Sequence, residues 1–269
     1  MASDQRAGGS SPSRRGIFDN QSNTLFAFLE MLNSKNRLLI IFVILFLSVR
    51  LDARELRKKE VFPLSKGNYW IYQGVVKAAQ SGSNIILEKK LTWKMKVESL
   101  ITKDNIAVAF IKGYPADLAW YEKGQGRGEY LIVNIDDRKF YLVKPLVKEK
   151  FLLKFNHDSK EAVSLLDDQW DMFIGFPLNP HQFCTGLDMP NTVDWLGRCY
   201  VEDQREMNLS NVKGLSNQKF IDYFLIQRDN TGHTFINFTP GVGITHYIYG
   251  HHGTVSEVDM KLVEFHQTN

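Results

Sequence analysis

Apolar and polar positions alternate through most of the chain after residue 60. In one segment Leu91, Trp93, Met95 and Val97 share a side, and the residues between them are polar or charged. Successive side chains of a strand point to opposite faces of a sheet, so this period of two predicts a half-buried β-strand. Residues 258–262 repeat the pattern.

Further runs rich in β-branched, aromatic and aliphatic residues predict more strands. These runs are Tyr69–Val76, Ile106–Ile111, Tyr130–Ile135, Phe140–Val143, Phe220–Gln227, Thr234–Phe238 and Ile244–Tyr249. The turn residues Asp136-Asp137 separate one close pair, and Asp229–Gly232 separates another, as expected of hairpins. So many short strands predict a mainly β fold, either an antiparallel open barrel or a sandwich.

One short helix interrupts this pattern. Asp158 and Glu161 have the spacing of a capping box, and apolar residues follow at helical spacing as far as Phe173. Gly175 and Pro177 then end the segment. We therefore expect a single helix between Asp158 and Phe173.

The chain also carries an apolar run of 12 residues, Leu38–Val49, preceded by Lys35 and Arg37 and followed by Ala53. A membrane-spanning helix needs about 20 apolar residues, whereas the apolar core of a signal peptide has about 7–15. The run therefore predicts either a signal peptide or a single N-terminal membrane anchor. We expect a disordered basic leader over 1–37, the signal or anchor with its cleavage site over 38–53, and an exported β domain over 54–269.

Two features leave the fate of this segment open. Basic residues such as Arg50 and Arg54 follow the run, and in an uncleaved anchor they would favour a cytoplasmic flank. Met31 offers an alternative start that would give a signal peptide of ordinary length. The predicted location is extracytoplasmic, either periplasmic or secreted, or anchored to the inner membrane through residues 38–49.

Charge and cysteine content narrow the class of protein. Residues 54–269 hold 27 Lys and Arg against 26 Asp and Glu, so no surface for nucleic acid is predicted. Cys184 and Cys199 are the only cysteines. In an exported protein they are a candidate disulfide, worth about 3 kcal/mol for a loop of this length, and two free buried thiols are the alternative.

The candidate site residues are few. His246, His251 and His252 lie near the C-terminus, where imidazoles could bind a metal, but a strand followed by a turn explains them better. Trp120 and Tyr121 precede a glycine-rich loop and could form a platform for a ligand or partner, or plug the end of a barrel. No catalytic residue, metal site or cofactor is predicted.

Two segments resemble a family. Phe62–Tyr72, with the sequence FPLSKGNYWIY, resembles the opening of many exported bacterial proteins, and the PGVGI sequence that begins at Pro240 resembles part of their closing hairpin. These are largely uncharacterised β-sheet proteins, secreted or lipoprotein-like. The chain lacks the lipidated cysteine of the lipoprotein members. The resemblance implies an exported β fold and no particular activity.

The sequence thus leads to a functional hypothesis with one alternative. We expect a non-catalytic binding module of the cell envelope, exported or tethered to the membrane, that binds an apolar ligand or a protein partner. The alternative is an envelope hydrolase or metal-dependent enzyme that uses the C-terminal histidines.

Overall fold

The computed structural model describes residues 60–79, 85–119, 127–166, 172–185 and 196–268. They belong to a compact unit, Lys59–Asn269. Within these residues the chain forms eleven strands: β1 (Tyr69–Ala79), β2 (Ile86–Lys103), β3 (Ile106–Lys112), β4 (Glu129–Ile135), β5 (Lys139–Val143), β6 (Met172–Gly175), β7 (Cys199–Asn208), β8 (Lys219–Arg228), β9 (Gly232–Thr239), β10 (Gly243–His251) and β11 (Ser256–His266).

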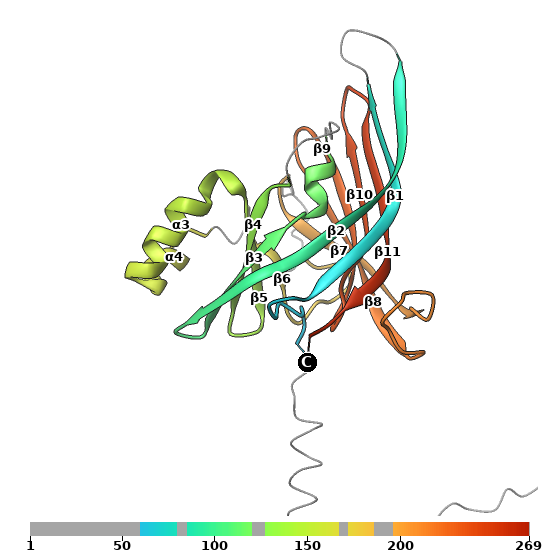
Figure 1. Cartoon of the computed structure of the whole chain (residues 1–269). Helices are drawn as coiled ribbons and strands as arrows, with labels where there is room; N and C mark the ends of the chain where they lie inside the picture. The colour runs from blue at the N-terminus through green and yellow to red at the C-terminus, as the bar shows by residue number, and fades with distance from the viewer. Residues whose placement is uncertain (1–59, 80–84, 120–126, 167–171, 186–195, 269) are drawn as a thin grey trace, which may run out of the picture. The chain divides into compact units, whose positions relative to one another are not determined.

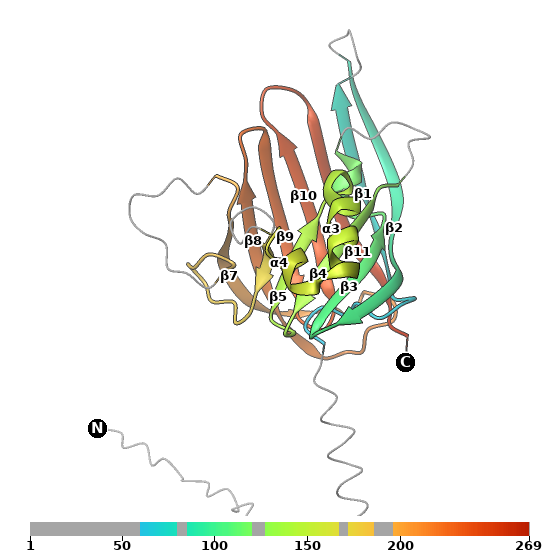
Figure 2. The ribbon, with the colours of Figure 1, turned by 90° about the vertical axis from the view of Figure 1, so that its left-hand side faces the viewer.

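All eleven strands belong to one sheet in the order β6-β5-β4-β3-β2-β1-β11-β10-β9-β8-β7. Each pair of neighbouring strands in this order is antiparallel, and the pairing of β1 with β11 joins the two halves of the chain. The sheet curls strongly, so that it forms a nearly closed barrel (Figures 1 and 2). The predicted mainly β, antiparallel fold is confirmed.

A short segment, residues 181–184, fills the seam between β6 and β7, the two end strands of the sheet. The Gly175 N–H donates to the Cys184 carbonyl (2.6 Å), and the Cys184 N–H donates to the Cys199 carbonyl (2.8 Å). Cys184 and Cys199 also form a disulfide. A covalent link therefore fastens this segment to β7.

The inner face of the barrel is packed with aromatic side chains. Trp70 and Tyr72 on β1 are fully buried. The Trp70 Nε1–H donates to the Val242 carbonyl (2.6 Å), and the Tyr72 hydroxyl donates to the Ile244 carbonyl (3.0 Å). Buried donors need an acceptor, and both of these have one. The ring of Phe62 lies against those of Trp70, Phe140, Phe173 and Phe238.

Two helices cover part of the outer face, α3 (Pro145–His157) and α4 (Ser159–Val163). Helix α3 lies beside β3 and β4 (Figure 2). Phe151 and Phe155 on α3 belong to a second apolar cluster, together with Val108 on β3 and Val133 on β4. Phenylalanines four residues apart lie on one side of a helix, so α3 buries that side on the sheet. Among the described residues, no helix is long and apolar enough to cross a membrane.

The predicted strands and turns agree with the structure, and the predicted helix does not. Each predicted strand lies within an observed one, and hairpins form at Asp136-Asp137 and at Asp229–Gly232. The capping residue is right, because Asp158 accepts hydrogen bonds from the Lys160 and Glu161 N–H groups. The helix it caps ends at Val163, however, and Phe173 lies in strand β6.

Helix α3 and the strands β6 and β7 were not predicted from the sequence. Pro145 opens α3, where the missing N–H of proline costs nothing. Strand β7 carries exposed polar residues over most of its length and shows no alternation. The leader, residues 1–53, lies outside the described residues.

Candidate functional site

The strand register aligns two rows of side chains on the outer face of the sheet. One row runs from Val75 on β1 through Asp259 on β11 and Ile248 on β10 to Phe235 on β9. The next row runs from Glu88 through Lys77, Glu257 and Gly250 to His233. Residues two apart on a strand face the same way, so both rows share the outer face.

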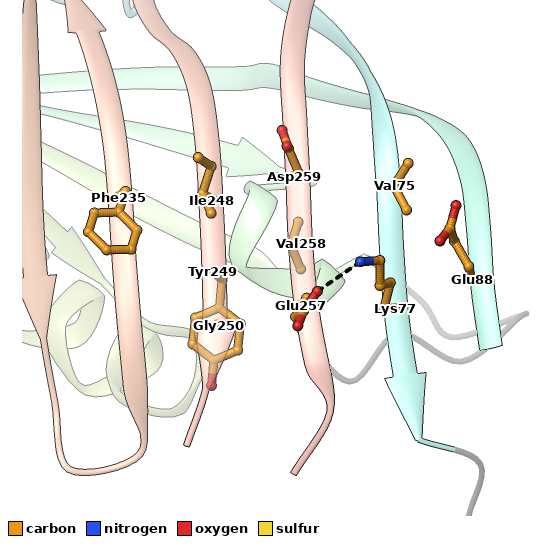
Figure 3. Close-up of a pocket in the computed structure, with 10 residues that line it drawn as sticks. All are labelled: Val75, Lys77, Glu88, Phe235, Ile248, Tyr249, Gly250, Glu257, Val258 and Asp259. Carbon is orange, nitrogen blue, oxygen red and sulfur yellow. Dashed lines mark ion pairs between the residues drawn. The ribbon is translucent and has the colours of Figure 1, made fainter. Parts of the chain in front are cut away.

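These rows surround a groove of about 530 Å³, which we call the outer groove (Figure 3). Such a volume is within the range of about 300–1,000 Å³ that is typical of ligand sites. The groove is lined by Val75, Lys77, Glu88, Phe235, Ile248, Tyr249, Gly250, Glu257, Val258 and Asp259.

Gly250 leaves the space that makes this groove. A Cβ atom built on Gly250 would meet no other atom within 4 Å, and the residue has no positive φ that would demand glycine. The half-buried side chains of Val75, Phe235 and Ile248 provide apolar surface beside it. The ring of Phe224 stacks on that of Phe235, with centroids 5.8 Å apart, and extends this apolar surface on β8.

Charged side chains line the same groove. Lys77 pairs with Glu257 (3.2 Å), and Asp259 pairs with the Nε2 atom of His246 (2.7 Å). With Glu88, the groove has three carboxylates and one ammonium group. Exposed ion pairs contribute little to stability, about 0–1 kcal/mol, so these groups are available for recognition.

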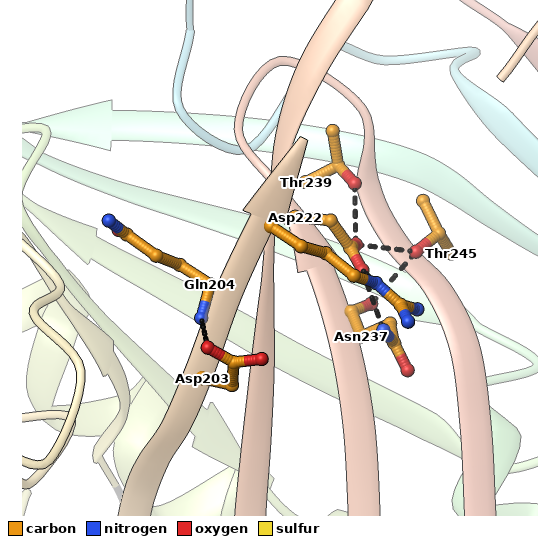
Figure 4. A network of polar contacts seen from close by, with 7 residues as sticks. Asp203, Gln204, Asp222, Asn237, Thr239 and Thr245 are labelled. Carbon is orange, nitrogen blue, oxygen red and sulfur yellow. Dashed lines mark hydrogen bonds and ion pairs between the residues drawn. The ribbon is translucent and has the colours of Figure 1, made fainter. Parts of the chain in front are cut away.

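A second polar cluster shares the strands β9 and β10 with the outer groove but is buried (Figure 4). The Asp222 carboxylate accepts hydrogen bonds from Asn237 Nδ2 (2.6 Å), Thr239 Oγ1 (2.9 Å) and Thr245 Oγ1 (3.1 Å). Arg205 Nε lies 3.6 Å from the same carboxylate. All four of these partners are side chains of β7, β9 and β10, so the cluster ties three strands to β8.

A smaller cavity of about 190 Å³ lies between the 3₁₀-helix η1 (Pro115–Leu118) and residues of strands β6, β9 and β10. Its lining includes Tyr114, Tyr247 and Tyr249. Burial raises the pKa of Tyr114 and Tyr247 well above the ordinary value, so both hydroxyls stay protonated. The volume is below that of typical ligand sites.

Asp117 on η1 contacts two residues near the start of β4, Gly128 and Tyr130. Its carboxylate accepts hydrogen bonds from the Gly128 N–H (2.8 Å) and the Tyr130 hydroxyl (2.9 Å). Burial raises the pKa of Asp117, and these hydrogen bonds and Arg127 partly offset the effect. Ala119 lines the cavity, whereas Trp120 and Tyr121, the predicted aromatic platform, lie outside the described residues.

The structure separates the three predicted histidines into two places. His246 is on β10 and contacts Asp259, at the edge of the outer groove. His251 ends β10, and His252 follows it and contacts His233, with 2.6 Å between the two Nε2 atoms. In the described part of the chain, no three His, Cys, Asp or Glu side chains form a group that could hold a metal.

The sequence matches no protein-family model and no curated protein. The chain is similar in structure to a predicted exported protein with a YmcC-like fold from Bacteroides fragilis. The identity is 11%, the TM-score is 0.38, and the match covers 77% of this chain and 99% of that one. For a predicted lipoprotein from Parabacteroides distasonis the identity is 14%, the TM-score 0.35 and the coverage 77% and 98%. Likenesses of this strength carry no inference about function.

Proposed function

We propose that this protein is a non-catalytic binding module of the cell envelope, and that it binds a segment of a protein partner in the outer groove. The single observation that carries the proposal is the groove itself. It combines half-buried apolar side chains with charged groups around an opening at Gly250. Apolar surface with a polar rim is the arrangement found in protein–protein interfaces.

The inside of the barrel is a poorer place for a ligand. Large side chains such as Trp70, Tyr72 and Phe238 are fully buried there. The cavity beside η1, about 190 Å³, is lined by tyrosines and is small for a lipid-sized molecule. A protein partner on the outer face therefore fits the described residues better than an apolar ligand within the barrel.

The charges of the outer groove indicate the chemistry of the partner. Three carboxylates, Glu88, Glu257 and Asp259, face one ammonium group, that of Lys77. Complementary charge steers association and selects the partner. We expect the bound segment to carry an apolar side chain, which would pack on Ile248 and Phe235, and at least one Lys or Arg.

Two observations support a location outside the cytoplasm or on a membrane face. The apolar run Leu38–Val49 has the length of a signal-peptide core. Cys184 and Cys199 form a disulfide, which is rare in proteins of a reducing cytoplasm. Intact-mass measurement on fractionated cells, with and without thiol alkylation, tests this part. A full-length species with two free thiols would contradict it.

Site-specific photo-crosslinking tests the binding surface in the full chain. A benzophenone amino acid replaces Ile248 within the outer groove or, as the control, Thr102, an exposed residue on β2 that does not line it. We expect a discrete crosslinked protein from position 248 and none from position 102. Equal crosslinking at both positions, or none at either, would contradict the proposal.

The crosslinked partner is then purified and its affinity is measured directly. Gly250→Val places a side chain in the outer groove, at a position where a Cβ atom would meet no other atom within 4 Å. Ala79→Val adds a similar volume to an exposed residue at the end of β1, outside the groove. We expect Gly250→Val to weaken binding at least tenfold and Ala79→Val to leave the Kd unchanged.

The alternative, an envelope hydrolase, uses the same C-terminal histidines. The contact between His246 and Asp259 (2.7 Å) is the observation in its favour, since a carboxylate can orient an imidazole for proton transfer. Replacing His246, His251 and His252 together by alanine separates the two functions. A hydrolase would lose its turnover of a simple ester such as p-nitrophenyl acetate, whereas a binding module has no such turnover to lose.

A further inference from the structure

Two histidines that are far apart in the sequence meet at the end of the β9–β10 pair. His233 is the second residue of β9, and His252 follows the last residue of β10. Their Nε2 atoms are 2.6 Å apart, and their ring centroids are 4.2 Å apart. Each imidazole therefore directs its outer nitrogen at the other.

The backbone holds both rings in place. His233 is paired with Gly250 across the sheet, and Gly232 is paired with His251. The His252 N–H donates to the Thr231 carbonyl (2.7 Å), so the turn after β10 is fastened to the turn before β9. The two imidazoles are thus brought together by strand register, and no side-chain rearrangement is needed for them to meet.

We propose that His233 and His252 form a two-imidazole binding site for a divalent transition metal such as Cu²⁺, Ni²⁺ or Zn²⁺. Imidazole nitrogens are preferred ligands of these ions. Metal–imidazole bonds are about 2.0–2.1 Å long, so two nitrogens on one ion lie about 3 Å apart. In the present contact one Nε2 atom donates its proton to the other, so binding of the ion would release that proton. The rings would also have to separate by less than about 1 Å and turn until both nitrogen lone pairs point at the ion.

The surroundings set the coordination of this site. No third His, Cys, Asp or Glu among the described residues completes a cluster with the pair, so water would take the remaining positions. His252 is exposed, which gives the ion an open path. Arg228 pairs with His233 across β8 and β9 and disfavours a cation, while Asp229 in the adjacent turn favours one.

The metal site is independent of the proposed partner binding. His233 lies opposite Gly250, at one end of the outer groove, but neither histidine lines the groove. Loss of metal binding would leave the proposed binding surface in place. Equally, a groove without a partner would leave the histidine pair unchanged.

Isothermal titration of the full chain, purified without a polyhistidine tag, with NiCl₂ and ZnCl₂ tests the site. We expect one equivalent to bind, and His233→Gln and His252→Gln each to weaken binding at least tenfold. His157→Gln is the matched control, because His157 is an exposed histidine at the end of α3. It should leave the affinity unchanged, and MgCl₂ should give no heat of binding.

Electron paramagnetic resonance of the Cu²⁺-loaded protein detects the imidazole nitrogens that are bound to the ion. A histidine that only stabilises the fold would not contribute to this signal. We expect hyperfine coupling from two imidazole nitrogens in the natural protein and from one in each single variant. Melting temperatures without metal show whether the variants remain folded. The proposal is wrong if the double variant His233→Gln/His252→Gln binds Ni²⁺ as tightly as the natural protein, or if no imidazole coupling is seen.

Discussion

The Asp222 cluster and the outer groove lie on the same outer face of the sheet and share strands β9 and β10, yet they differ in every other respect. Asp222 is buried and its carboxylate has three hydrogen-bond donors, which come from β9 and β10. In the outer groove, by contrast, Gly250 leaves open space, and the charged residues Glu88, Glu257 and Asp259 are exposed.

The difference shows how one sheet face can serve both stability and recognition. The Asp222 cluster includes Thr245, which lies at an irregularity in strand register between Ile244 and His246. A buried polar group is costly unless it is hydrogen-bonded, so a satisfied cluster favours one register over the others. The outer groove has no such closed network, and its groups are available to another molecule.

The largest expected effect follows from opening the buried cluster. Asp222→Ala removes the acceptor of three hydrogen bonds and leaves Asn237, Thr239 and Thr245 without it. We expect a loss of about 3 kcal/mol or more in the free energy of unfolding, measured by urea denaturation. Asp203→Ala, an exposed neighbour, is the control and should change stability by less than about 0.5 kcal/mol. Equal losses of stability in the two variants would show that the buried, hydrogen-bonded Asp222 matters no more than an exposed carboxylate.

Reduction of the disulfide should lower the free energy of unfolding by a similar amount, without changing the Asp222 cluster or the outer groove. Cys184 and Cys199 are 15 residues apart, and a crosslink of that span stabilises by about 3 kcal/mol in the chain-entropy model. Urea denaturation with and without a phosphine reductant measures it. We expect partner binding in the outer groove to persist under mild reduction, because neither cysteine lines it. A loss of less than about 1 kcal/mol in the free energy of unfolding would contradict a stabilising role for this disulfide.

Two glycines within strands, Gly74 on β1 and Gly250 on β10, differ in the space around them. A Cβ on Gly74 would lie 1.8 Å from the Asp259 carbonyl oxygen, whereas a Cβ on Gly250 would touch nothing. Gly74→Ala should therefore destabilise by about 2 kcal/mol, because the packed strands must shift. Gly250→Ala should be neutral or stabilise by about 0.5 kcal/mol, since glycine within a strand is unfavourable. Thermal unfolding of both variants would contradict this account if their order were reversed.

The smallest effect concerns the turn between β8 and β9. Burial alone would raise the pKa of Asp229, but hydrogen bonds from the Thr231 hydroxyl and the Thr231 and Gly232 N–H groups outweigh it and lower the pKa below 3.8. A carboxyl whose pKa is lowered by folding stabilises above its unfolded pKa and loses that contribution as the pH falls through the folded pKa.

The measurement is the melting temperature of the natural protein and of Asp229→Ala between pH 5 and pH 2. We expect the natural protein to melt at the higher temperature at pH 5, and the difference to shrink as the pH falls below 3.8. A difference that stays constant over this range would show that the hydrogen bonds of Asp229 do not depend on its charge.

Strands with one buried face could be predicted from the sequence because their buried apolar residues alternate with exposed polar ones. Strand β2, for example, alternates around Trp93 and Met95, which face the core. Strand β7 could not be predicted in this way, since its residues beyond Val201 are mostly exposed on both faces. Helix α3 left a usable signal, Pro145 at its first position and Phe151 and Phe155 four residues apart.

The outer groove could not be predicted from the pattern of residues along any single strand. The outer groove needs β1 beside β11 and β11 beside β10, and its first and last lining residues are Val75 and Asp259. His233 and His252 meet for the same reason, across 19 residues of sequence. Periodicity places a residue on a face, but only strand order and register place two faces side by side.

Partner binding in the outer groove is tested best by the Kd of the partner crosslinked through Ile248, measured for the natural protein and for Gly250→Val. A Cβ atom at Gly250 would meet no other atom within 4 Å, so we expect the valine side chain to enter the outer groove without destabilising the sheet. We expect at least a tenfold weaker Kd for the variant and no change for Ala79→Val. An unchanged Kd for Gly250→Val, with the variant fully folded, would show that the outer groove is not the binding surface.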